Sequence, residues 1–154
     1  MARTLFRHVL VPHDFSDQAT VALKTAGQLA KQQGGKLTVL HVLVPFYLPA
    51  DVPFGMPGPG DLIPEQRRRL ERLVTKTLGA TRPPVTVRVD IGDAAQRIID
   101  AARGTDSIVM ATSGRTGMAH FLIGSVAEKV VRHATVPVLT LRVPVSKRQP
   151  RRRK

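Results

Sequence analysis

Short apolar segments typical of buried strands alternate along this chain with segments of helical periodicity, and this alternation constrains the fold more than any other feature. Five segments are strand-like: residues 8–11, 36–44, 85–91, 107–111 and 136–143. Between them, apolar residues recur three or four positions apart, as in amphipathic helices. No hairpin turn joins consecutive strands. We therefore expect a doubly wound, Rossmann-like α/β domain, in which a five-stranded parallel sheet carries helices on both faces.

Capping residues predict where the helices begin. We expect N-caps at Ser16, Asp93 and Ser125, the last two within capping boxes, and a helix start near Pro64. Residues 45–64 contain six of the twelve prolines of the chain. Because that is too many for a helix or a central strand, we predict an irregular, exposed loop there.

The positive charge of the chain is concentrated at its end. The 154 residues carry a formal net charge of +13, and residues 144–154 supply six basic side chains and no acidic one. We expect one domain over residues 1–143, followed by a disordered basic tail. An alternative that stays open is that the tail binds nucleic acid through phosphate contacts. The arginines within residues 67–72 should form a solvated face of the second helix.

Composition excludes several classes of protein. The longest unbroken apolar run, residues 108–111, is far shorter than the about 20 residues of a membrane span. The chain contains no cysteine, which excludes disulfide scaffolds and thiolate metal sites. Its histidines lack the spacing of a metal site. We expect a cytoplasmic protein without a membrane segment.

The segment from Ala111 to Ser125 carries the strongest functional signal. It leaves a predicted strand, is punctuated by glycines and enters a predicted helix. Glycines allow main-chain N–H groups to form an anion-binding nest, and a helix start adds further unpaired N–H groups. The Ser125 hydroxyl can donate a hydrogen bond, and Arg115 supplies positive charge. These features favour a phosphate site; the alternative is a flexible connection in which Ser125 only caps its own helix.

Two other loops lie at the carboxyl ends of predicted strands, where ligands bind in such sheets. Asp14 can accept hydrogen bonds from ribose hydroxyls or help hold a divalent metal, or it can only cap the first helix. His13 beside it can contact a nucleotide. The main chain of Val42 can hydrogen-bond an adenine edge. The Met110 side chain is placed in the core rather than against a ligand.

Three of these segments resemble one family in order, spacing and structural context. Residues 110–125, with the Val-Ala-Glu-Lys-Val-Val-Arg-His sequence that follows, resemble the signature of universal stress proteins, as do residues 10–16 and 40–42. The resemblance covers residues 5–143. It implies an α/β domain similar to the adenine nucleotide α-hydrolases. In the family's nucleotide-binding branch, it also implies ATP as ligand, accompanied by Mg²⁺ or Mn²⁺ at Asp14, and a homodimer paired through residues 138–142.

That branch carries the motif Gly, two residues, Gly, nine residues, Gly-Ser/Thr. The chain matches it at Gly114, Gly124 and Ser125, with Ala111 in place of the first glycine. The added methyl group is tolerated if the main chain there keeps a negative φ. The resemblance implies nucleotide contacts from Pro12, His13, Asp14, Val42, Met110, Ala111, Gly114, Arg115, Thr116, Gly117, Gly124, Ser125 and Val126.

Patterns of efficient phosphoryl transfer and of dinucleotide binding are missing. The sequence has no Gly-x-x-x-x-Gly-Lys-Ser/Thr motif, and no Gly-x-Gly-x-x-Gly follows the first strand. Asp14 is the only acid that we place near the site. The predicted function is therefore a nucleotide-dependent stress-response switch or sensor with at most slow ATP hydrolysis. The alternative is a family member that binds no nucleotide and acts through dimerisation and partner binding.

Overall fold

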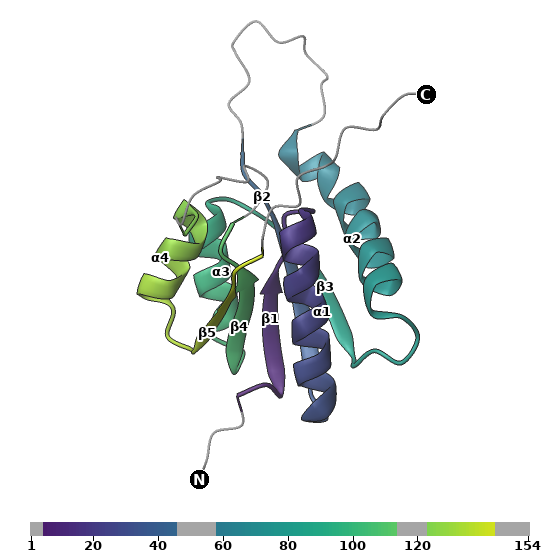
Figure 1. Ribbon diagram of the computed structural model, residues 1–154. Coiled ribbons are helices and arrows are strands. Elements are labelled where there is room, and N and C mark those ends of the chain that lie inside the picture. Colours follow the sequence, from purple (N-terminus) through teal and green to yellow (C-terminus); the bar gives the residue numbers. More distant parts are fainter. Residues whose placement is uncertain (1–4, 46–57, 114–122, 144–154) are drawn as a thin grey trace, which may run out of the picture.

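The structure is a computed structural model that describes residues 5–45, 58–113 and 123–143. Its strands are His8–Pro12 (β1), Lys36–Leu43 (β2), Val85–Ile91 (β3), Ser107–Ala111 (β4) and Val138–Leu141 (β5). Its helices are Asp17–Gln32 (α1), Ile63–Leu78 (α2), Ala94–Ala102 (α3) and Ser125–His133 (α4), with a short 3-10 helix, η1, at Pro59–Leu62. The five strands form one parallel sheet in the order β3-β2-β1-β4-β5, as predicted (Figure 1).

Each face of the sheet has its own apolar core. The central strand β1 is buried on both faces, and its side chains alternate between them because an extended chain has a period of two. Val9 and Val11 pack with α1 and with Leu70 of α2, whereas Leu10 packs with α3 and with Val130 of α4. Figure 1 shows these two pairs of helices on opposite faces. The doubly wound arrangement is confirmed.

Some predicted boundaries are wrong. The strand predicted over residues 136–143 is the shorter β5, since Pro137 has no N–H group for a ladder. Likewise, β2 ends at Leu43, one residue early. The loop predicted over residues 45–64 contains η1 in its described part. The Asp61 carboxylate accepts a hydrogen bond from the Gly58 N–H at 2.8 Å and so stabilises this helical turn.

Two of the predicted helix caps are observed. The Ser16 hydroxyl accepts a hydrogen bond from Ala19 N at 3.1 Å and caps α1. Similarly, Asp93 caps α3 by accepting a bond from Gln96 N at 2.9 Å. The Gln96 side chain does not return to the cap as a capping box requires, because it donates to Asp100 at 3.1 Å.

The predicted cap of α4 is wrong. Gly124, not Ser125, is the N-cap, and no side chain caps this helix. The first bond within the helix runs from Glu128 N to Gly124 O at 2.9 Å. The helix begins one residue early because Gly124 N is itself bound to Thr112 O, at 2.6 Å. That bond fixes the main chain ahead of Ser125.

Among the residues that the structure describes, no helix is long and apolar enough to cross a membrane.

Candidate functional site

The sheet reverses its winding between β1 and β4. From β1 the chain winds outward through β2 to β3, and it then crosses back to β4 and β5. The strands β1 and β4 share two registered pairs, Val9 with Ser107 and Leu10 with Ile108. No registered pair follows these two toward the carboxyl ends of β1 and β4, so the two strands separate there. The loops after β1 and β4 therefore begin on either side of a split in the sheet. Ligands of open α/β sheets bind at such a switch point.

His13, which follows β1, anchors its loop to the rest of the domain. Its side chain is buried, its N–H donates to Leu40 O at 2.8 Å, and its carbonyl accepts from His41 Nδ1 at 2.8 Å. His13 Nδ1 accepts from Phe15 N–H at 3.0 Å, and Nε2 lies 3.3 Å from Thr20 Oγ1. Both ring nitrogens therefore have partners within the protein.

The ring of His13 is neutral at ordinary pH. Desolvation by burial lowers its pKa from 6.5 to about 4, against the raising influence of the Asp14 carboxylate and with a smaller lowering by His41. The hydrogen bond accepted at Nδ1 requires this neutral form, with the proton on Nε2. The loop at the end of β1 is thus built on an uncharged histidine.

Phe15 has an unusual main-chain conformation beside this histidine. Its φ is 65°, and among the described residues no other non-glycine residue has a positive φ. Such a conformation costs a bulky residue about 1–3 kcal/mol. The centroids of the Phe15 and His41 rings lie 4.5 Å apart, and the Arg69 guanidinium lies 3.9 Å from the centroid of the Phe15 ring. These contacts offset the strain. Arg69 was predicted to be a solvated side chain, and the structure shows that it also packs on the Phe15 ring.

The roles of Phe15, His41 and Arg69 in holding this loop were missed. Nothing in the sequence signals a positive φ at a phenylalanine. A signal did exist for His41, because a polar side chain inside an apolar strand must find a buried hydrogen-bond partner. That partner is the carbonyl of His13.

Asp14 lies between the two anchored residues and is half-buried. One of its carboxylate oxygens accepts a hydrogen bond from Ser16 N–H at 3.0 Å. The N-cap of α1 is Ser16, so Asp14 is not the cap of this helix, and its bond to Ser16 N–H supports the turn ahead of the cap. The carboxylate follows β1 at the split in the sheet, and the ribose contact stays a prediction. Pro12, the last residue of β1, is the other predicted contact in this segment.

The main chain of Val42 points toward the same split. Leu40 O accepts from His13 N on the β1 side, whereas Leu43 O accepts from Gly92 N on the β3 side. Because successive residues of a strand alternate in direction, the N–H and C=O groups of Val42 face the β1 side, like those of Leu40. The last registered pair there is Pro12 with Leu40, so Val42 lies beyond the end of β1.

Ala111, the last residue of β4, keeps an extended main chain and has no positive φ. The condition for accepting alanine in place of the first motif glycine is therefore met. The Met110 side chain is 5% exposed and packs in the core with α3 and α4. Its placement in the core is confirmed, and a nucleotide contact from Met110 would have to come from its main chain.

The start of α4 is joined to the end of β4. Besides the bond from Gly124 N to Thr112 O, a Cβ added to Gly124 would lie 3.1 Å from that same oxygen. No side chain caps α4, so the amides of Ser125 and Val126 precede the first helical bond without a side-chain acceptor from the cap. Four further predicted contacts lie outside the described residues: Gly114, Arg115, Thr116 and Gly117.

Comparison with known proteins agrees with this arrangement. The model of the universal stress protein family matches residues 5–142. Universal stress protein MJ0531 of Methanocaldococcus jannaschii is 31% identical over 150 residues, which cover 91% of this chain and 84% of the relative.

Solved structures share the fold. The universal stress protein UspA from Lactobacillus plantarum has a TM-score of 0.71 and 26% identity, and the match covers 92% of this chain and 100% of that one. The universal stress protein from Archaeoglobus fulgidus, in complex with dAMP, has a TM-score of 0.61 and 21% identity, and the match covers 88% and 98%. This chain belongs to the universal stress protein family.

Proposed function

We propose that this protein binds ATP at the split between β1 and β4 and acts as a nucleotide-dependent switch or sensor in stress responses. The observation that carries the proposal is the uncapped start of α4 at the end of β4, with the amides of Ser125 and Val126 ahead of the first helical bond. Unpaired amides and the helix dipole favour a phosphate group. A family member with the same fold, in complex with dAMP, supports an adenine nucleotide.

The other described residues give each part of the nucleotide a partner. The Asp14 carboxylate would accept hydrogen bonds from the ribose hydroxyls. The N–H and C=O groups of Val42, which face the β1 side beyond the end of that strand, would pair with the adenine edge. The anchoring of the β1 loop by His13 and Phe15 holds Asp14 in place before a ligand arrives. A site fixed in advance loses less conformational entropy on binding.

Hydrolysis should be slow at most. Across the ranges 5–45, 58–113 and 123–143, no three His, Asp or Glu side chains gather to hold a metal ion. Asp14 alone would face a Mg²⁺ or Mn²⁺ ion bound to the triphosphate. Efficient phosphoryl transfer needs more charged groups around the phosphates and a positioned base, so the proposal is for binding rather than turnover.

Calorimetric titration of the full chain with ATP and Mg²⁺ tests the proposal. A Gly124→Val variant places its Cβ 3.1 Å from Thr112 O, and its two further methyl groups crowd the space ahead of the first amides of α4. We expect saturable ATP binding in the wild type and none at millimolar ATP in the variant. Gly60→Val is the matched control, because a Cβ at Gly60 meets nothing within 4 Å.

Two outcomes would contradict the proposal, provided that circular dichroism shows both variants folded. An unchanged ATP affinity in Gly124→Val would remove the start of α4 from the site. A wild-type chain that shows no heat and no thermal shift with millimolar ATP would favour the alternative function, a partner-binding protein without nucleotide.

We also propose a cytoplasmic homodimer in which β5 pairs with β5 of a second copy. β5 ends the strand order, and the carbonyls of Pro137 and Leu141 accept bonds from the β4 side, each at 2.9 Å. The main chain of Val138 and Thr140 therefore faces the open edge. Thr140→Pro removes an outward N–H but no β4 bond. Light scattering should show a dimer for the wild type and a monomer for this variant; a dimeric variant would contradict the pairing.

A further inference from the structure

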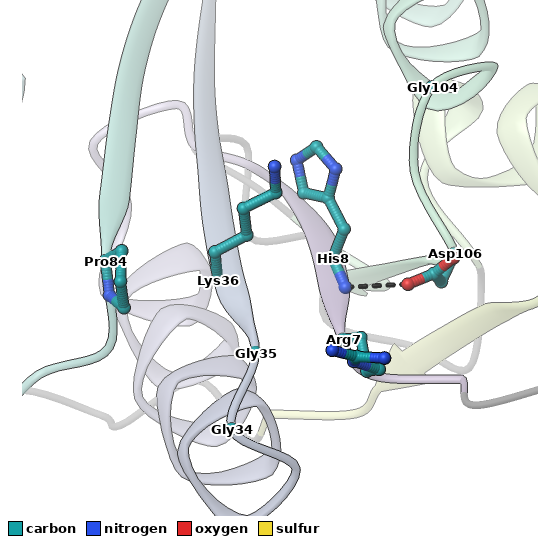
Figure 2. Close-up of a pocket in the computed structure, with 8 residues that line it drawn as sticks. All are labelled: Arg7, His8, Gly34, Gly35, Lys36, Pro84, Gly104 and Asp106. Carbon is teal, nitrogen blue, oxygen red and sulfur yellow. Dashed lines mark hydrogen bonds between the residues drawn. The ribbon is translucent and has the colours of Figure 1, made fainter.

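A hollow lies at the amino-terminal ends of the strands, at the opposite end of the sheet from the proposed nucleotide site. It has a volume of about 630 Å³, which falls within the range of small-molecule sites. Its lining comes from the starts of β1 and β2 and from the turns that precede β2, β3 and β4: Arg7, His8, Gly34, Gly35, Lys36, Pro84, Gly104 and Asp106 (Figure 2). No residue of the proposed nucleotide site belongs to it.

Cationic and neutral donors dominate this lining. His8 and Lys36 are direct partners in the register of β1 and β2, and Figure 2 shows their side chains extending side by side from the same face of the sheet. Among the described residues, neither Arg7 nor Lys36 takes part in an ion pair. Two positive charges thus border the hollow without an ion pair, and Asp106 is the one carboxylate among its lining residues.

The single acid of the lining has another role. The Asp106 carboxylate accepts a hydrogen bond from His8 N at 2.8 Å, and Asp106 N donates to His8 O at 2.8 Å. This pair of bonds fastens the turn after α3 to the start of β1. The His8 ring is held as well, with Nε2 2.9 Å from Thr38 Oγ1. Burial and then the charge of Lys36 lower the pKa of His8, so the ring adds a neutral donor or acceptor rather than a third charge.

Glycines keep the hollow open. A Cβ at Gly34 or Gly104 would meet nothing within 4 Å, so these residues border free space. A Cβ at Gly35 would lie 2.5 Å from Arg7 O. Only glycine therefore allows the turn after α1 to lie against the start of β1, where Lys36 N donates to Arg7 O at 2.7 Å. That close approach brings the two cationic residues onto neighbouring main chains.

We propose that this hollow binds an oxyanion of the phosphate class, with Lys36 and Arg7 as its charged donors and the His8 ring beside Lys36. An ammonium and a guanidinium are the side chains that bind phosphate oxygens most strongly, through charge-assisted hydrogen bonds. The volume leaves space for the remainder of a phosphorylated small molecule. This site is independent of ATP binding at the other end of the sheet.

Histidine ring signals in NMR spectra of the full chain provide the test. Sodium phosphate is added at constant pH and ionic strength, with chloride as the balancing anion. We expect the His8 signals to shift saturably, whereas those of the exposed His133 should not saturate along with them. Lys36→Gln and Arg7→Gln should each weaken phosphate binding at least about tenfold. Lys24→Gln, an exposed lysine on α1, is the matched control and should bind like the wild type.

A charge-specific variant separates binding from folding. Asp106→Asn keeps an oxygen that can accept from His8 N but removes the negative charge, so phosphate should bind several-fold more tightly. Ribose 5-phosphate and oligothymidylate serve as further probes for the source of the phosphate. The same Lys36-dependent shift of His8 with ribose 5-phosphate would indicate a phosphorylated small molecule, and with oligothymidylate a nucleic-acid backbone. The proposal is overturned if phosphate moves the His8 signals no more than chloride does, or if Lys36→Gln and Lys24→Gln bind phosphate equally.

Discussion

His13 should make the stability of this protein depend on pH in a direction fixed by its surroundings. In the folded chain the pKa of His13 is lowered by burial to about 4, from an ordinary value of 6.5. Between these two pH values the unfolded chain binds more protons than the folded chain, so the free energy of unfolding rises with pH. The contribution is complete above about pH 6.5 and is lost as the pH falls toward 4.

The size of the effect follows from the same two pKa values. One pKa unit corresponds to about 1.4 kcal/mol, so the difference between 6.5 and about 4 corresponds to about 3 kcal/mol. His8, whose pKa is also lowered, adds to the loss in the same direction. A variant is therefore needed to isolate His13.

His13→Asn is that variant. An asparagine Oδ1 can replace Nδ1 as the acceptor of Phe15 N–H, but it does not titrate. Urea unfolding at pH 7 and pH 4 should show that the free energy of unfolding falls by about 3 kcal/mol less in His13→Asn than in the wild type. His133→Asn, at an exposed position on α4, is the control for replacing a histidine. Parallel pH profiles for the wild type and His13→Asn would refute the reasoning.

Two further substitutions, both on α2, test the packing near the loop that follows β1. Leu70→Ala removes a fully buried side chain of α2 and should lower the free energy of unfolding by about 2–5 kcal/mol in urea titrations; a loss below 1 kcal/mol would mean that the core on this face collapses around the gap. Arg69→Ala removes the cation over the Phe15 ring and should cost about 0.5–1 kcal/mol. Its neighbour Arg68→Ala is the control, and equal losses in the two variants would contradict a specific contact with Phe15.

The fold was predictable because its signals are local and repeated. In β1, the triplet Val9-Leu10-Val11, which Pro12 ends, is enough to predict a strand buried on both faces, and the structure packs these residues against helices on both sides. The caps at Ser16 and Asp93 were predictable for the same reason, since each involves an amide only three residues away. Period and capping act over a few residues, and a sequence displays them directly.

The details of the candidate site depend on contacts between distant residues. Gly124 replaces Ser125 as the cap of α4 through a bond to Thr112, and no pattern within residues 124–128 contains that information. The conformation of Phe15 is likewise supported by His41 from β2 and Arg69 from α2. Tertiary contacts of this kind override local preference. The sequence therefore predicted where β1 and β4 end, to within one residue, but not how the loops after them are held.

The extended conformation of Ala111 bears on how such sites are recognised in other sequences. At this position the family pattern has glycine, yet the strand does not use the freedom that glycine provides. Alanine restricts the unfolded chain more than glycine does. An Ala111→Gly substitution should therefore lower the free energy of unfolding by about 0.5–1 kcal/mol without relieving any main-chain strain. A sequence search for this motif that requires glycine at the first position would miss chains like this one, although an extended strand end can hold alanine there.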